Sequence, residues 1–245
     1  MPVSSQVVAE LAPTGVLRVG LNLSNFLLIS ARDADGGPVG VAPDFGAAIA
    51  DRLGVPVRYV PYPKPGELAD AAGTGAWDIG LIGAEPARAE KIEFTPAYVE
   101  IQATYLVPPD SSLRTIADVD QPGIRIASTA RTAYGLWLDR NIKHAEIVHS
   151  DNMDTTFELF QRDRLDALSG LRPRLLTDLP RIPGARILDG QFAAVQQAIG
   201  TLRENKAGAQ FLREFAAESI SSGLVAALIR KHGVEGLSVA PTFQP

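Results

Sequence analysis

One stretch of the sequence, from Trp77 to Tyr98, constrains the fold more than any other. It begins with a mostly apolar run, residues 78–83, that is too short for a stable helix and is interrupted by glycine. Such a run is typical of a buried strand whose glycines allow another backbone or a ligand to approach closely. Pro86 follows at a position that suits the first residue of a helix. The stretch therefore predicts a buried strand that turns directly into a helix.

This predicted turn is a suitable place for binding an anion. The free amides in the first turn of a helix point outwards, and the helix dipole adds partial positive charge there. Arg88 falls in this first turn, and its planar guanidinium presents donors that suit a carboxylate. The alternative is a solvated Arg88 on the surface, paired with Glu85 or Glu93. The residues alone leave both interpretations open.

The stretch resembles the signature of the family 3 extracellular solute-binding proteins, the amino-acid receptors of ABC importers. That signature runs from an aspartate through apolar residues and a small loop to Thr-Pro-Glu-Arg. It closes with a hydrophobic residue and Asp-Phe-Ser/Thr-x-Pro-Tyr. The counterparts here are Asp78, residues 86–88 and residues 93–98. The likeness continues in residues 17–20, 40–54 and 219–233, so it covers nearly the whole chain.

The resemblance implies a type II periplasmic binding fold: two α/β lobes with central sheets, joined by two hinge crossovers. Strands and helices are expected to alternate from Leu17 onwards, which by itself predicts a mostly parallel sheet covered by helices. We expect the crossovers at residues 99–107 and 191–200, and a small inter-domain helix at residues 111–120. Locally, we expect a hairpin turn at residues 35–37, a helix that ends at Gly54, and a second-lobe helix capped by Asp154. Lobe 1 would comprise residues 14–103 and 192–245, and lobe 2 would comprise residues 104–191.

Open α/β sheets bind ligands at the carboxyl ends of their strands, where this chain has polar and small residues. These positions, together with those the family uses, give the candidate ligand-binding residues. In lobe 1 they are Asn22, Asn25, Phe26, Gly83, Ala84 and Arg88, and in lobe 2 they are Arg131, Thr132, Ser169, Leu171 and Arg172. The alternative for the first loop is an ordinary polar loop with Phe26 in the core.

Some of these positions depart from the family pattern. The family grips the ligand's carboxylate with a second-lobe turn that usually has glycine where this chain has Arg131. Members that bind α-amino acids usually place an aspartate where this chain has Leu171, followed here by Arg172. The loop between Asp78 and Arg88 is also shorter than usual and lacks residues that normally meet the ligand's amino group.

These departures bear on the ligand. An unpaired buried ammonium costs several kcal/mol, so a di- or polycarboxylate, or a phosphorylated acid, is favoured over a neutral amino acid. If Arg131 and Arg172 instead point to solvent and pair on the surface, an amino acid remains an equal alternative.

The composition argues against several other classes of protein. A chain of 245 residues suits one or two domains. The formal net charge of −5, without a block of like charges, gives no sign of a nucleic-acid or anionic-membrane partner. The chain has no cysteine, its three histidines lack metal-binding spacing, and no common catalytic motif occurs. We therefore expect a monomer with no cofactor, no metal and no catalytic residue.

The expected function is that of a solute-binding protein: it closes around a small carboxylate-bearing ligand and delivers it to the membrane subunits of an ABC importer. One alternative is a cleft enzyme of the cyclohexadienyl or prephenate dehydratase type, although we find no acidic residue at the expected cleft positions. Another is a cytoplasmic ligand sensor. Residues 1–15 lack the features of a secretory signal peptide. The resemblance implies the periplasm, whereas a genuine start at Met1 would imply the cytoplasm.

Overall fold

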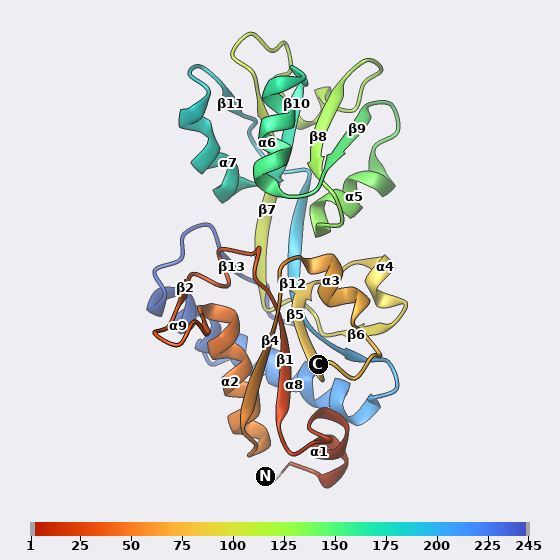
Figure 1. The fold of residues 1–245 in the computed structure, drawn as a ribbon, viewed down its shortest axis with the longest axis vertical. Coiled ribbons are helices and arrows are strands. Elements are labelled where there is room, and N and C mark those ends of the chain that lie inside the picture. The colour runs from red at the N-terminus through yellow and green to blue at the C-terminus, as the bar shows by residue number, and fades with distance from the viewer. Residues whose placement is uncertain (1–2, 244–245) are drawn as a thin grey trace. The chain divides into compact units, whose positions relative to one another are not determined.

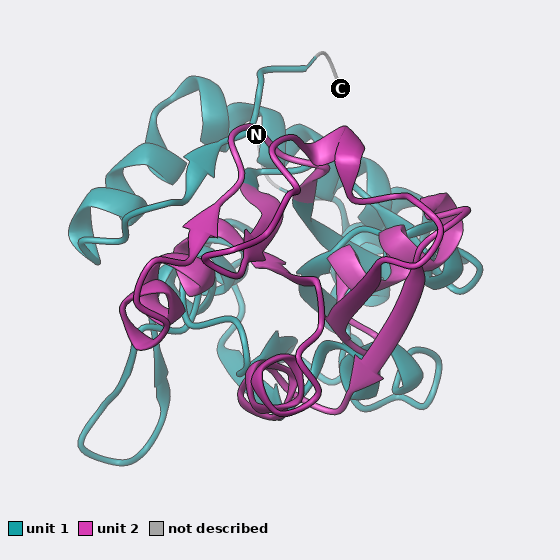
Figure 2. Ribbon diagram, turned by 90° about the horizontal axis from the view of Figure 1, so that it is seen from above, with its two compact units in different colours: residues 1–100, 196–245 teal, residues 101–195 magenta. Residues whose placement is uncertain are grey.

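The computed structural model describes residues 3–243. The chain divides into two compact units: unit 1 runs up to Glu100 and resumes at Gln196, and unit 2 comprises Ile101–Val195 (Figure 2). The chain passes from one unit to the other within strands β7 (Val99–Val107) and β12 (Ala193–Leu202). From the sequence, these passages were expected after residues 103 and 191. Residues 244–245 of the predicted lobe 1 lie outside the described part of the chain.

Unit 1 is built on three parallel strands in the order β4-β1-β5 (Figure 1). These are β1 (Leu17–Asn22), β4 (Val57–Tyr62) and β5 (Ile79–Gly83). Strand β12 continues the sheet antiparallel to β5 and pairs with the short β6 (Ile92–Phe94), while β13 (Ser238–Val239) pairs with the beginning of β7. The predicted alternation of strands and helices with a largely parallel sheet is confirmed for this unit.

Several helices belong to unit 1. They are α1 (Ser5–Leu11), α2 (Val41–Leu53), α3 (Pro65–Asp70), α4 (Pro86–Ala89), α8 (Lys206–Ser221) and α9 (Leu224–Lys231). Strands β2 (Ala31–Arg32) and β3 (Pro38–Val39) form the predicted hairpin around residues 35–37. Helix α2 ends, as predicted, at Gly54, whose φ of 73° is the left-handed conformation that glycine adopts at little cost.

The core of unit 1 forms where the apolar face of α2 covers the sheet. Phe45 and Ile49, spaced by one helical turn, are both fully buried. The ring of Phe45 stacks on Tyr98 with centroids 4.5 Å apart and lies 5.5 Å from Phe215 of α8. The end of the Trp77–Tyr98 stretch is thereby fixed in the core, which holds the turn after β5 in place.

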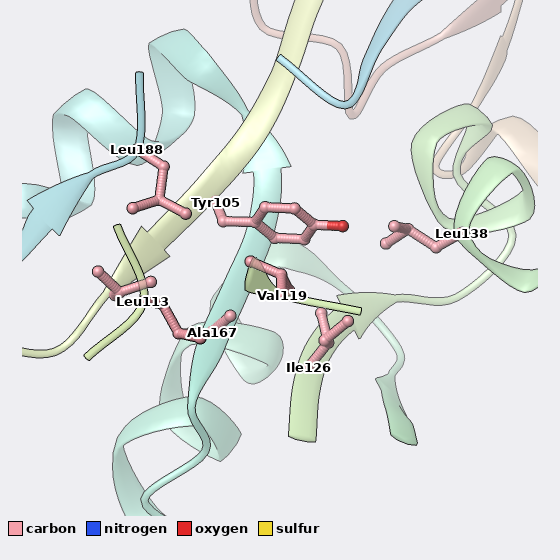
Figure 3. Packing of buried hydrophobic residues seen from close by; sticks show 8 residues of the cluster. Tyr105, Leu113, Val119, Ile126, Leu138, Ala167 and Leu188 are labelled. Carbon is pink, nitrogen blue, oxygen red and sulfur yellow. The ribbon is translucent and has the colours of Figure 1, made fainter. Parts of the chain in front are cut away.

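Unit 2 repeats the α/β construction with the parallel strands β10-β8-β9 (Figure 1). They are β8 (Arg125–Thr129), β9 (Glu146–Ser150) and β10 (Ala167–Leu171); β7 pairs antiparallel with β10, and β11 (Arg186–Ile187) with β7. The helices are α5 (Ala133–Asn141), α6 (Met153–Arg162) and α7 (Arg172–Asp178). One buried cluster joins β7, β8 and α5 through Tyr105, Ile126 and Leu138 (Figure 3).

Two local predictions in unit 2 are wrong. The predicted helix at residues 111–120 is only a single 3₁₀ turn, Ile116–Asp118, because Asp118 Oδ2 accepts hydrogen bonds from the amides of Arg114 and Thr115 and closes the turn. Asp154 does not cap α6. Asn152 does, since its Oδ1 accepts from the amide of Thr155 at 2.9 Å.

None of the helices within residues 3–243 combines the length and the apolar character needed to cross a membrane.

Candidate functional site

The turn after β5 brings together the most informative of the predicted site residues in unit 1. Strand β5 is buried along its whole length and ends at Gly83. The amide of Ala84 then donates to the carbonyl of Gln196 at 2.7 Å, and α4 begins at Pro86. This hydrogen bond to β12 holds the chain at the point where β5 ends. The backbone of the turn is therefore fixed at the carboxyl edge of the sheet, where such sheets bind ligands.

Arg88 is buried in this turn, with 6% of its surface exposed. Its Nη1 donates to the carbonyl of Gly83 at 2.6 Å. The interpretation of Arg88 as a solvated surface residue is therefore wrong. Glu93, one of the two acids suggested as its surface partner, lies in β6, and its Oε1 is 3.9 Å from Arg213 Nη2. Since α4 has only four residues, its dipole contributes little. The guanidinium, and not the helix dipole, is therefore the candidate anion-binding group of the turn.

The beginning of β5 is braced against β1. The guanidinium of Arg18 donates to both carboxylate oxygens of Asp78, at 2.9 and 2.5 Å, and its amide donates to Oδ2 at 2.8 Å. The carbonyl of Asp78 accepts from Thr201 Oγ1 at 3.0 Å. Asp78, the first residue that matches the family signature, therefore has a structural role: it positions β5.

The loop after β1 lies at the same edge of the sheet as the turn after β5, because the two strands are parallel and paired. Asn22 Oδ1 accepts from the hydroxyl of Ser24 at 2.8 Å, and buried Asn25 accepts from the amide of Leu27 at 3.3 Å. Phe26 is 36% exposed, so its placement in the core is wrong. The loop therefore places the ring of Phe26 and the hydrogen-bonded amide of Asn22 at the edge of the sheet where β5 ends.

Glu85, which is not among the predicted site residues, lies in the same turn as Arg88. It lies between Ala84 and Pro86, and only 8% of its surface is exposed. Its backbone carbonyl accepts hydrogen bonds from the amides of Arg88 and Ala89, each at 3.0 Å. An acidic residue placed directly between the end of a glycine-rich strand and a helix-starting proline is the sequence signal that could have identified it.

In unit 2 the corresponding turn joins β8 to α5. Thr132 caps α5: its Oγ1 accepts from the amide of Gly135 at 3.0 Å and donates to the carbonyl of Thr129 at 2.9 Å. Arg131, just before it, is exposed and has a φ of 59°. This left-handed backbone explains why glycine suits the position. A charged side chain is thus held at the amino end of a nine-residue helix.

The other predicted residues of unit 2 lie at β10 and are engaged within the unit. Ser169 is buried in the strand and donates to the carbonyl of Ala127 at 2.9 Å. Leu171 is buried and offers no polar side-chain atom. Arg172 Nε donates to Gln102 Oε1 at 2.9 Å, and its Nη2 donates to the carbonyls of Leu188, at 3.2 Å, and Gly190.

Two cavities lie away from these residues. One of about 520 Å³ in unit 2 is lined by residues that include Leu113, Phe160 and Asp166, near the amino ends of β8 and β10. One of about 480 Å³ in unit 1 lies among α1, α2 and α8. Neither contains a predicted site residue, and ligands of such sheets bind at the carboxyl ends of the strands. Among the described side chains, no group of three or more histidine, aspartate or glutamate residues is arranged to hold a metal ion.

The family model described as bacterial extracellular solute-binding proteins, family 3, matches residues 17–235. Among curated proteins, no match was found.

Several solved structures share the fold. A mutant of ArgBP from T. maritima is 23% identical with a TM-score of 0.73, covering 94% of this chain and 100% of its own. The ancestral amino acid-binding protein AncCDT-1, a precursor of cyclohexadienyl dehydratase, is 21% identical and has a TM-score of 0.72. The match covers 91% of this chain and 98% of AncCDT-1. An amino acid ABC transporter substrate-binding protein from Streptococcus pneumoniae, bound to L-arginine, is 19% identical and has a TM-score of 0.72. The match covers 97% of this chain and 100% of that protein's chain.

Proposed function

Because the chain belongs to the bacterial extracellular solute-binding proteins of family 3, we propose that it is the solute-binding protein of an amino-acid-type ABC transporter and binds a small carboxylate-bearing ligand. The predicted type II periplasmic binding fold is confirmed by the similar structures. Placement outside the cytoplasmic membrane and delivery of the ligand to importer membrane subunits are part of the proposal.

The observation that carries the proposal is the buried guanidinium of Arg88 at the carboxyl edge of the unit 1 sheet. Its hydrogen bond to the carbonyl of Gly83 fixes the orientation of the planar group before any ligand arrives. A carboxylate matches the paired donors of a guanidinium, and the weak screening of a buried charge strengthens such a contact. The ligand's carboxylate is therefore assigned to Arg88, with Gly83, Ala84, Asn22, Asn25 and Phe26 around it.

The second half of the proposed site is the turn before α5. Thr132 and Arg131 lie at the amino end of this helix, where amides and the helix dipole favour an anionic or polar ligand group. The chain connects the two units only through the strands β7 and β12 among the described residues. In this proposal a ligand that contacts both turns stabilises a closed arrangement, and the two strands act as the hinge.

The first experiment identifies the ligand. Native mass spectrometry of the purified protein searches for a co-purified small acid, and calorimetry then measures its affinity. We expect Arg88→Ala to weaken binding by about 2–5 kcal/mol, because it removes one partner of a buried charge pair. The matched control is Arg58→Ala, which removes an exposed arginine of β4 and is expected to leave the affinity unchanged.

Two outcomes would contradict the proposal. Equal affinities of the wild type and Arg88→Ala would remove Arg88 from the site. Turnover of prephenate by the purified protein would instead support a dehydratase.

A further inference from the structure

Arg172 lies next to the point where the chain enters unit 2. It directly follows β10 and is the first residue of α7. Strand β7 runs antiparallel to β10 with Leu171 opposite Ala103, so the next pair along this register is Arg172 and Gln102. Gln102 is the second residue of unit 2. The turn after β10 therefore brings Arg172 beside the incoming end of β7.

The segment that leads out of unit 2 lies along the other edge of β7. Leu106 is opposite Leu168 of β10 and also opposite Ile187 of β11, so these two strands flank β7. After β11, the amides of Leu188 and Phe192 donate to carbonyls of β7 at 2.9 and 3.0 Å. The chain then enters β12 and returns to unit 1. The incoming and outgoing segments are thus neighbours within unit 2.

The side chain of Arg172 joins these two segments across β7. Its Nε donates to Oε1 of Gln102 at 2.9 Å, and its Nη2 donates to the carbonyls of Leu188, at 3.2 Å, and Gly190. A guanidinium can bridge three acceptors because it presents several donors in fixed directions in one plane. All four residues belong to unit 2, so the bridge is complete within this unit.

Strand β7 is also held from the side of unit 1. Strand β13 pairs with it as far as Glu100, and the amide of Ala240 donates to the carbonyl of Tyr98 at 3.1 Å. The strand is therefore fixed by unit 1 up to Glu100 and by Arg172 from Gln102 onwards. This arrangement concentrates bending of β7 around Ile101, which lies between the two fixed positions.

We propose that Arg172 is a positioning residue of the hinge: it clasps the unit 2 ends of both connecting segments, so that they bend together. Without the clasp, Gln102 and residues 188–190 move separately, and the ligand-free protein samples a wider range of arrangements. The clasp thereby lowers the conformational entropy that closure around a ligand has to overcome. This inference rests on the proposed function, because it assigns a part of the proposed hinge.

The test uses the full chain, dialysed to remove small molecules and measured without ligand. The chain has no cysteine, so Asp51→Cys in α2 and Glu158→Cys in α6 introduce one exposed attachment point in each unit. Spin labels at these points report the distribution of distances between the units by double electron–electron resonance. We expect Arg172→Ala to broaden this distribution. An arginine that only binds ligand would leave it unchanged when ligand is absent.

Hydrogen exchange measures the clasp directly. We expect Arg172→Ala to speed the exchange of the amides of Leu188 and Phe192 on the order of 10-fold, because their segment loses two hydrogen bonds. Gln102→Ala removes the acceptor of Nε and is expected to broaden the distance distribution as well. The double variant is expected to show less than the sum of the two effects, since both substitutions break the same bridge.

The matched control is Arg174→Ala in the same helix. Arg174 donates to Asp154 and Asp178, and neither of these lies in a connecting segment. We expect this variant to lower the Tm but to leave the width of the distance distribution unchanged. Circular dichroism and the Tm verify that every variant folds.

The possible failures are distinguishable. A folded Arg172→Ala variant with the distance distribution of the wild type overturns the clasp, and so do fully additive effects of the substitutions at Arg172 and Gln102. Both results leave the proposed function intact, because they are obtained without ligand. A wild type that binds no small acid in native mass spectrometry and calorimetry overturns the proposed function, and with it the part of Arg172 in closure.

Discussion

At the scale of single residues, two arginines occupy backbone conformations that suit glycine. Arg131 has a φ of 59° and Arg164 a φ of 49°. A left-handed backbone costs an L-residue about 1–2 kcal/mol relative to the right-handed form. Arg164 follows Asp163, the residue that caps the end of α6, where glycine is the usual choice. Arg131 lies instead in the turn proposed to bind ligand, where a strained residue suggests a functional side chain.

Replacing each arginine by glycine separates these two roles. We expect Arg164→Gly and Arg131→Gly each to raise the free energy of unfolding by about 1 kcal/mol, because the strain is relieved. Only Arg131→Gly is expected to weaken ligand binding. Urea unfolding and calorimetry measure the two effects. Equal affinity of both variants and the wild type would show that Arg131 does not contact the ligand.

At the scale of elements, the amino end of α5 depends on one side chain. Thr132 accepts from the amide of Gly135 and is the cap of the helix. We expect Thr132→Ala to lower the free energy of unfolding by about 1 kcal/mol, since an amide loses its partner. Thr132→Ser keeps the hydroxyl and should retain most of the stability. Denaturant unfolding checks both, and an alanine variant as stable as the serine variant would contradict the capping role.

The contact between α2 and α9 predicts a dependence of stability on pH. Asp44 in the first turn of α2 accepts from Lys231 Nζ at 2.8 Å and contacts His232 Nε2 at 2.7 Å. Burial alone would raise the pKa of Asp44, but the hydrogen bonds from Lys231 and His232 outweigh it, so the pKa is lowered. A carboxyl group whose pKa is lower in the folded state stabilises the protein above its unfolded pKa, and this stabilisation is lost as the pH falls through the lowered value.

We therefore expect Asp44→Asn to reduce the free energy of unfolding by about 1 kcal/mol at neutral pH, the size expected for a partly exposed ion pair. The difference from the wild type should shrink below about pH 4, where the unfolded carboxyl becomes protonated, and disappear below the lowered pKa. Urea titrations at several pH values measure it. The control Asp51→Asn changes an exposed aspartate of α2, and an equal pH profile for the two variants would argue against the contact.

At the scale of the whole molecule, the two passages of the chain through β7 and β12 are the basis of the proposed hinge. Once a ligand is found, we expect a concentration of 100 times its Kd to stabilise the protein by about 2.7 kcal/mol and to raise its Tm. The radius of gyration in solution scattering should decrease at the same time, because the ligand favours a closed arrangement. Stabilisation without compaction would indicate binding to one unit only.

The local elements and their order could be predicted from the sequence. The buried run 79–83, the proline that starts α4 and the glycine that ends α2 act through neighbouring residues, so their patterns can be read directly. The two errors, at residues 111–120 and at Asp154, are also local. In both places a side-chain oxygen accepts hydrogen bonds from nearby backbone amides: Asp118 in the first case and Asn152 in the second. The spacing of apolar residues does not predict such side-chain contacts.

The surroundings of the candidate site residues could not be predicted from the sequence, because they depend on the tertiary fold. Arg88 and Glu85 are both charged and lie near a proline. In a sequence this combination is as typical of a solvated turn as of a buried binding site. Their burial follows from packing of the turn after β5 against chain segments far away in sequence, such as β12. Arg172 donates to Gln102, 70 positions earlier, and no local sequence pattern predicts that contact. Burial and hydrogen-bond partners depend on residues brought together by folding, and this determines whether a charged side chain meets water, the protein or a ligand.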